Sequence, residues 1–183
     1  MRRFLFVLLL AGLVASAPVF GSQQTVVGTA PPEWTAREWL NSPPLTLSGL
    51  KGKVVVVRWW TGPGCPYCAE SAPSLDALWE KYRSRGLVVI GMYHHKSHAP
   101  LTPEHVAQQA DHLGIHFPIG IDRDWKTLHS WWLDRQSDAA WTSVSFVLDR
   151  AGVIRFVHPG GSLVEGTPDF AALEKAVVAA LKE

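Results

Sequence analysis

The stretch that decides the fold is VVVVRWWTGPGCPYC, residues 54–68. Its first seven residues are mostly β-branched and apolar, which is typical of a strand covered on both faces, as in a parallel sheet. A turn rich in glycine and proline follows, and then come Cys65 and Cys68, the only two cysteines of the chain. A structural disulfide framework normally uses more cysteines at longer spacings. The pair therefore points to chemistry rather than to scaffolding.

Downstream of the cysteines, apolar residues recur at helical spacing and predict a helix with one buried stripe: Leu75, Leu78, Trp79 and Tyr82. Gly86 ends this helix, and residues 87–92 predict a second buried strand. Strand, helix and strand make a βαβ unit. Because the helix begins directly after the first strand, Cys65 and Cys68 fall at its N-terminus.

The remaining elements follow from caps and periodicity. Thr102-Pro103 and Thr167-Pro168 each place an N-cap before a proline, and so predict two further helices. Short strands are predicted at residues 45–47 and 117–121, a short helix at 125–132, and a β-hairpin from 144–148 and 153–157. The fold class is α/β and resembles the thioredoxin fold, a central mixed β-sheet with helices on both faces. An extra helix and strand are inserted after the first βαβ unit.

Composition favours one globular domain. The chain has 183 residues, 47% of them hydrophobic and 18% charged, which is enough for a single sizeable core. Lys and Arg total 17 and Asp and Glu 16, without like-charged blocks, so no nucleic-acid partner is expected. The expected organisation is a secretory signal over residues 1–21, an irregular lead-in over 22–44 and a thioredoxin-like domain over 45–183.

The N-terminus has the layout of a secretory signal peptide. Arg2 and Arg3 precede an apolar stretch over residues 4–14 and then small residues, with cleavage expected near residues 17–21. The domain is therefore expected to be exported, into the bacterial periplasm. An uncleaved signal that tethers the protein to the membrane is the alternative, and a cleaved one leaves no membrane span in the mature chain.

The position of the CxxC motif predicts its chemistry. At a helix N-terminus, free N–H groups and the positive end of the helix dipole favour a thiolate, the species that attacks disulfides. Cys65 would attack a partner disulfide and Cys68, one turn on, would resolve the mixed disulfide. Pro66 suits the first helical turn, and Tyr67 contributes to the redox poise. No cofactor is expected beyond a redox-active disulfide between Cys65 and Cys68. The alternative interpretations of the pair are a structural disulfide and half of a zinc site.

These residues resemble the redoxin, or TlpA/ResA-like, branch of the thioredoxin superfamily. The likeness rests on residues 45–53, the valine run, the tryptophan pair, the CxxC motif with Pro73, and residues 145–155, and it extends over roughly residues 30–183. It implies exported thiol–disulfide oxidoreductase activity on protein thiols or disulfides, with a membrane-bound electron donor as a further expected partner.

The chain departs from the family pattern around the expected site. Ser143, followed by Val144, stands where the family has a cis-proline, and a trans peptide is expected there because a cis bond before serine costs about 2.5–4 kcal/mol. Arg58 stands where thioredoxins keep a buried acid, and an arginine cannot act as a base. The family's helix glutamate is replaced by Ser71, with Glu70 one place earlier as a substitute to be tested.

A histidine cluster offers a second function. The two strands of the βαβ unit are parallel, so residues 94–98 should lie at the same sheet edge as Cys65. A copper- or metal-binding chaperone would use Cys65, Cys68 and the histidines His94, His95 and His98. The alternative is that these histidines are solvated loop residues.

Two further hypotheses concern peroxidase activity and the tryptophans. A thiol peroxidase is third in rank, because Gly62 stands where peroxiredoxins place a threonine, with Thr61 one position too early. The nine tryptophans are mostly expected in the core. An aromatic wall around the cysteines, with Trp60 and Trp141 docking a peptide, is the functional alternative.

Overall fold

The structure, a computed structural model, describes residues 26–62, 64–136 and 141–183. The predicted signal segment 1–21 and the start of the lead-in, 22–25, lie outside the described residues. Within them, the strands are β1 (Trp39–Leu40), β2 (Val54–Trp60), β3 (Leu87–Tyr93), β4 (Ile119–Ile121), β5 (Ser145–Leu148) and β6 (Ile154–His158). The helices are α1 (Pro66–Tyr82), α2 (Pro103–Leu113), α3 (Lys126–Leu128) and α4 (Pro168–Ala180), with short helical turns η1 (Ser48–Leu50), η2 (Arg83–Arg85) and η3 (His129–Leu133).

The strands form one mixed sheet in the order β1-β4-β3-β2-β5-β6. Strands β2 and β3 pair in parallel, and α1 connects them, so the predicted βαβ unit is confirmed. Strands β5 and β6 form the predicted antiparallel hairpin, and β5 pairs antiparallel with β2. This is a thioredoxin-like α/β fold with β2 at its centre.

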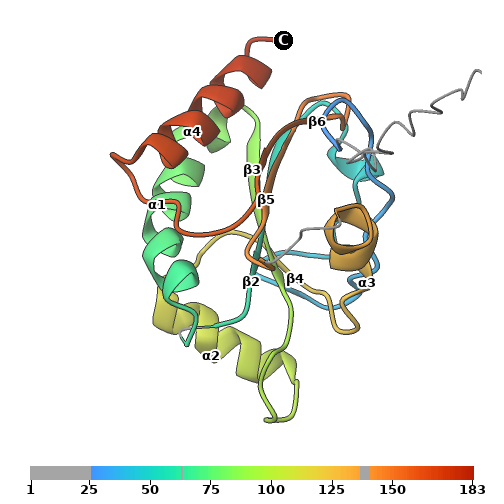
Figure 1. The fold of residues 1–183 in the computed structure, drawn as a ribbon, viewed down its shortest axis with the longest axis vertical. Helices are drawn as coiled ribbons and strands as arrows, with labels where there is room; N and C mark the ends of the chain where they lie inside the picture. The colour runs from blue at the N-terminus through green and yellow to red at the C-terminus, as the bar shows by residue number, and fades with distance from the viewer. Residues whose placement is uncertain (1–25, 63, 137–140) are drawn as a thin grey trace, which may run out of the picture.

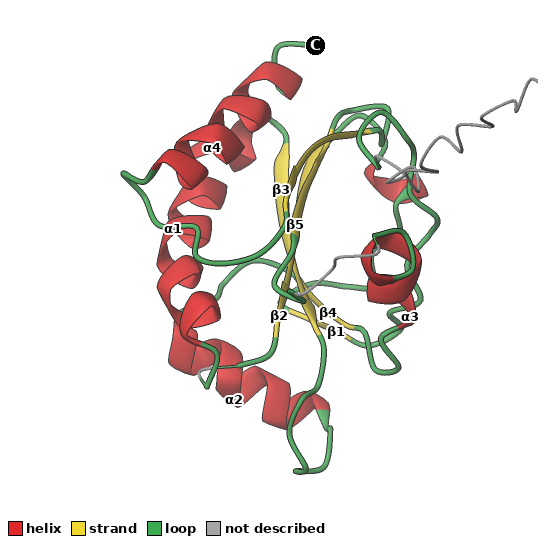
Figure 2. Ribbon diagram, in the orientation of Figure 1, coloured by secondary structure: helices red, strands yellow, loops and turns green. Residues whose placement is uncertain are grey.

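Helices cover both faces of the sheet. Helices α1, α2 and α4 lie on one side, and α3 lies on the other together with most of the chain between residues 26 and 50 (Figures 1 and 2). Along β2 the side chains alternate between two cores: Val54, Val56 and Trp60 pack on the α1 side, whereas Val55, Val57 and Trp59 pack on the α3 side. Because both faces are covered, every residue of β2 is buried.

The predicted caps are confirmed. The hydroxyl of Thr102 accepts a hydrogen bond from the N–H of His105, and the hydroxyl of Thr167 accepts one from the N–H of Phe170. Gly114 ends α2 in the left-handed conformation, which glycine adopts at low cost. These caps set where α2 begins and ends and where α4 begins.

One strand prediction is wrong. Residues 45–47 are not a strand but lead into η1, because their backbone bonds to side chains of the lead-in: the carbonyl of Leu45 accepts from Nε1 of Trp34, and the N–H of Leu47 donates to Glu33. The lead-in instead contributes β1, which pairs antiparallel with β4, and Val26 and Trp34 are buried in the core on the α3 side. Residues 26–44 are thus irregular along most of their length yet packed into the same unit.

None of the helices in the described part of the chain is both long and apolar enough to span a membrane.

Candidate active site

The two cysteines form a disulfide at the N-terminus of α1, immediately after the central strand. Cys65 is the N-cap residue, and its sulfur accepts a hydrogen bond from the backbone N–H of Cys68 at 3.3 Å. Pro66 occupies the first helical turn, where its missing N–H costs nothing. The sulfur of Cys65 therefore lies where backbone N–H groups and the helix dipole favour negative charge.

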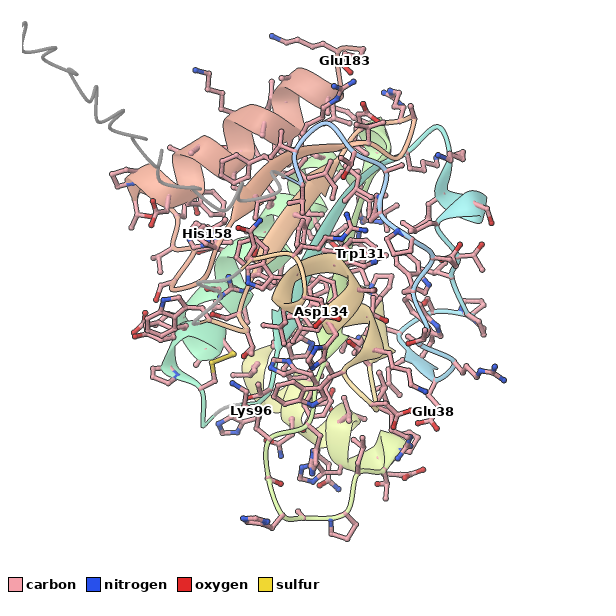
Figure 3. The ribbon with its side chains drawn as sticks, turned by 45° about the vertical axis from the view of Figure 1, so that its right-hand side comes forward. Glu38, Lys96, Trp131, Asp134, His158 and Glu183 are labelled. Carbon is pink, nitrogen blue, oxygen red and sulfur yellow. A yellow bond between two sulfur atoms is a disulfide. The ribbon has the colours of Figure 1, made fainter. Side chains whose placement is uncertain are left out.

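The two sulfurs differ in accessibility. Cys65 is half-buried and lines a groove of about 630 Å³, whereas Cys68 is only 4% exposed and faces the core behind it. The groove is bounded by residues from four segments, including Pro66, Tyr67, Lys96, His105, Gln109, Trp141 and Ser143. In Figure 3 the yellow sulfur–sulfur bond and the labelled Lys96 lie near each other on the left-hand side of the view. A partner can reach Cys65 from this groove, but not Cys68.

One member of the predicted aromatic wall is present. Trp141 is 48% exposed, lines the groove and meets the ring of Tyr67 edge-on at a centroid distance of 5.3 Å. Trp60 is 3% exposed and packs edge-on against Tyr93 inside the α1-side core. The hypothesis that Trp60 docks a substrate is therefore wrong, because its place on β2 points it under α1 rather than toward solvent.

The segment before β5 forms another wall of the groove. Ser143 lines it and is largely buried, and its hydroxyl accepts a hydrogen bond from the N–H of Gly161 at 3.3 Å. No cis peptide bond occurs among the described residues, so the expected trans bond before Ser143 is confirmed. The carbonyl of Val144 accepts a hydrogen bond from the N–H of Trp59, which ties this segment to β2.

Beneath the cysteines lies a buried arginine. The guanidinium of Arg58 donates hydrogen bonds to the hydroxyls of Ser145 and Ser71 and to the carbonyls of Tyr67 and Gly161. Burial lowers the pKa of Arg58 to about 9. The hydroxyl of Ser71 also donates to the carbonyl of Tyr67 and accepts from the N–H of Leu163, so Ser71 joins α1 to the segment after β6.

Glu70 does not take part in this buried network. Its side chain is exposed and accepts a hydrogen bond from the hydroxyl of Ser162. The neighbouring Ser71 is the position that faces the interior. The carboxylate of Glu70 thus bonds at the surface, whereas the sulfur of Cys68 is buried.

The comparisons with known proteins agree with this geometry. The sequence model of one family, described as Redoxin, matches residues 27–177. The chain belongs to the Redoxin family. Protein DipZ of Mycobacterium tuberculosis is 30% identical over 136 residues, which cover 73% of this chain but only 19% of DipZ. The chain thus spans about a fifth of that relative's length.

Two further relatives match over most of their length. Thiol-disulfide oxidoreductase ResA of Bacillus anthracis is 24% identical over 156 residues, which cover 83% of each chain. The crystal structure of a thiol-disulfide isomerase from Corynebacterium glutamicum is 27% identical, with a TM-score of 0.67, over 84% of this chain and 96% of the other. This Redoxin-family chain thus has a thioredoxin-like fold, and Cys65 and Cys68 form a disulfide-bonded CxxC pair.

The histidine cluster is split between two faces of the sheet. His94 is fully buried on the α3 side, where its ring meets Trp125 edge-on at 4.9 Å, and burial lowers its pKa to about 3. His95 instead interacts with the hydroxyl of Tyr93 at 3.0 Å and with the carbonyl of Ala99. His98 is exposed.

This arrangement removes the geometric basis of the metal-chaperone alternative. Among the described residues, no three His, Cys, Asp or Glu side chains are grouped so that they could hold a metal ion. The ring nitrogens of His94 are buried without a hydrogen-bond partner among the described residues. They lie on the face of the sheet opposite to Tyr93, because successive residues leaving a strand point to opposite faces.

Several groove residues were missed by the sequence analysis. His105 and Gln109 reach the groove from α2, one helical turn apart on the same face, and Lys96 reaches it from the loop after β3. Residues four positions apart in a helix share a face, so the sequence alone places His105 and Gln109 on one face of α2. It gave no sign that α2 packs beside the CxxC loop, which only the tertiary structure shows.

Proposed function

We propose that this protein exchanges disulfides with protein substrates outside the cytoplasm, with Cys65 as the attacking cysteine and Cys68 as the resolving one. The observation that carries this assignment is the difference in accessibility between the two sulfurs at the end of one groove. Only Cys65 can meet a macromolecular sulfur, and Cys68 lies one helical turn behind it.

The exchange proceeds in two balanced steps. A substrate thiolate attacks the sulfur of Cys65, breaks the Cys65–Cys68 bond and releases the thiolate of Cys68. A second substrate thiolate then attacks the substrate sulfur of the mixed disulfide and releases the thiolate of Cys65. The substrate gains a disulfide, the enzyme becomes a dithiol, and the substrate's two thiol protons pass to solvent or to the enzyme's thiolates. The reverse sequence reduces a substrate disulfide.

The groove supports a peptide rather than a small molecule as substrate. It is open, it has a volume of about 630 Å³, and an exposed tryptophan and a tyrosine stand on one side of Cys65. Large aromatic side chains at a rim supply contact area with little loss of conformational entropy. Extended segments of partner proteins fit these features, and a membrane-bound donor of electrons would be one such partner.

Trapping tests the roles of the two cysteines. In a Cys68→Ser variant the mixed disulfide between Cys65 and its partner cannot be resolved, so covalent complexes should accumulate and disappear on reduction. A Cys65→Ser variant is the matched control, and it should trap few partners because Cys68 is buried. Equal trapping by both variants, or none by either, would overturn the proposed roles.

Export rests on the N-terminal sequence, in which Arg2 and Arg3 precede an apolar stretch and small residues. Sequencing the N-terminus of protein purified from a bacterial periplasmic extract checks this directly. A start between residues 18 and 22 is expected. Full-length protein found only in the cytoplasm would contradict export.

A further inference from the structure

Arg58 is a buried cation that lacks an anionic partner. It is 2% exposed in the middle of β2, and none of the ion pairs within residues 26–62, 64–136 and 141–183 includes it. The same burial lowers its pKa. A buried charge without a counter-charge is costly, and such groups usually persist where they serve a function.

All of its hydrogen-bond acceptors are neutral. The shortest bond runs to the carbonyl of Gly161 at 2.6 Å, and the bond to the hydroxyl of Ser145 is 3.1 Å long. The other two acceptors are the carbonyl of Tyr67 and the hydroxyl of Ser71, on the first turns of α1. The Nε atom has no hydrogen-bond partner among the described residues. The guanidinium is therefore fixed in place with one donor to spare.

Cys68 is the redox-active residue that lies beside Arg58. Tyr67 and Ser71 stand on either side of it in α1, and Arg58 and Cys68 line the same small cavity of about 10 Å³. The remaining walls of that cavity are largely apolar and include Trp60, Leu75 and Phe117. In so dry a place the attraction between opposite charges is stronger than at a surface.

The other titratable groups around the guanidinium do not supply a negative charge. His158 of β6, labelled in Figure 3, is buried, and burial together with the charge of Arg58 lowers its pKa. Asp169 of α4 lies 3.4 Å from the Nε2 atom of His158, and its carboxylate is mostly exposed. Glu70 of α1 faces outward. Among the described residues, Cys68 is thus the group at hand that can become an anion beside Arg58.

We propose that Arg58 is the counter-charge of the Cys68 thiolate in the reduced enzyme. This inference rests on the proposed function and adds a direction to it. In the disulfide form the guanidinium has no anion, and when the Cys65–Cys68 bond breaks, the electron pair that goes to the sulfur of Cys68 creates one beside it. The reduced state is stabilised relative to the oxidised state, so the enzyme becomes a stronger oxidant.

The role of Arg58 is one of positioning, since it acts through Cys68. A guanidinium cannot accept the proton of Cys68, so it does not replace an acid–base residue. It makes Cys68 a better leaving group when a substrate thiolate attacks Cys65, because thiols that ionise more readily leave faster. The same charge slows the return attack of Cys68 on the mixed disulfide, because a more stable thiolate is less nucleophilic.

The first test follows the ionisation of Cys68 in a Cys65→Ser background, by the absorbance of the thiolate at 240 nm against pH. Replacing the cation in Arg58→Met should move the titration midpoint upward by about one to three pH units, the usual effect of a close opposite charge. Arg58→Lys, which keeps the charge, should move it less. Arg155→Met, which removes an arginine near Asp149 instead, is the matched control and should leave the midpoint unchanged.

The second test is the equilibrium of the two-cysteine protein with glutathione. Arg58→Met should favour the disulfide at least about 10-fold more than the wild type does, which corresponds to about 30 mV toward a more reducing potential. Unchanged values in both tests would overturn the role of Arg58. If the wild type does not exchange with glutathione at all, the proposed function fails. The role of Arg58 is then still tested by the Cys68 titration, which requires no exchange.

The proposal can still be tested if Arg58→Met does not fold. Arg58→Gln keeps a side-chain N–H donor without the charge and serves as the second neutral variant. Circular dichroism with urea unfolding shows which variants are folded. The Cys68 titration in the protein that keeps Arg58 is itself a test and needs no Arg58 variant. A Cys68 midpoint far above the ~8.5 of a free thiol, with Arg58 in place, would show that burial acts unopposed and would overturn the inference.

Discussion

Replacing Trp141 with alanine should slow the reaction of the folded enzyme with protein substrates. The side chain of Trp141 is 48% exposed at the groove. A tryptophan side chain can bury about 200 Å², so a docked peptide that covers its exposed half removes roughly 100 Å² from water. At about 25 cal/mol per Å² this is worth ~2.5 kcal/mol.

That free energy sets the size of the effect. Since about 1.4 kcal/mol is a factor of ten, the upper limit is a fall of about 60-fold in kcat/KM for a protein disulfide. Ordering of the peptide and of Trp141 offsets part of it, so we expect about 10-fold or more. The buried half of Trp141, which packs against Tyr67 and Gly160, contributes to folding by a similar amount. The rates are therefore compared under conditions in which circular dichroism shows the wild type and the variant to be folded.

The assay compares a disulfide-bonded protein with glutathione disulfide as substrates, because the small molecule covers less of the tryptophan. Trp79→Ala is the matched control: Trp79 is half-buried on α1, outside the groove, and contacts Arg83. The reasoning is refuted if Trp141→Ala retains wild-type kcat/KM for the protein substrate, or if both variants slow to the same extent.

Two predictions concern stability. Burial lowers the pKa of His94 to about 3, whereas an unfolded histidine titrates near ~6.5. The unfolded state therefore binds more protons between these values, and stability falls as pH drops below about 6.5. Urea unfolding at pH 7 and 4.5 should show a shallower loss for His94→Leu than for the wild type, by up to ~1.4 kcal/mol per pH unit. Exposed His112, changed to glutamine, is the control, and equal slopes for the wild type and His94→Leu would contradict the burial argument. Gly91→Ala would place a Cβ atom 2.8 Å from Nε1 of buried Trp60, so it should cost about 1–3 kcal/mol and lower Tm. Gly64→Ala, which meets nothing within 4 Å, should not, and a Gly91→Ala protein as stable as the wild type would contradict the packing at β3.

The helices and the central strands were predictable because their signals are local. Four valines in succession require a strand covered on both faces, and Thr102 and Thr167 each cap a helix through their own hydroxyls. Strand β1 was not predictable, since two residues carry no period and their pairing with β4 depends on a segment far along the chain. The strand predicted at residues 45–47 was wrong for the same reason, because three residues are too few to establish a period of two.

At the site, the sequence located the cysteines but not their surroundings. Strand parity places Trp59 and Trp60 on opposite faces, and because both faces of β2 are covered, neither can form a surface wall. The same parity sends His94 away from the side chain of Tyr93, which lines the groove. Applied residue by residue, the period of two could have corrected both hypotheses. The part that α2 plays in the groove could not be foreseen, because it depends on helix packing.

The central claim is that the sulfur of Cys65, held at the N-terminus of α1, ionises more readily than an ordinary thiol. The most direct measurement is the rate of alkylation of Cys65 by iodoacetamide as a function of pH, in a reduced Cys68→Ser protein. The account predicts a midpoint at least about one unit below the ~8.5 of a free cysteine. A midpoint at or above that value, with a rate no greater than that of a free thiol, would contradict it.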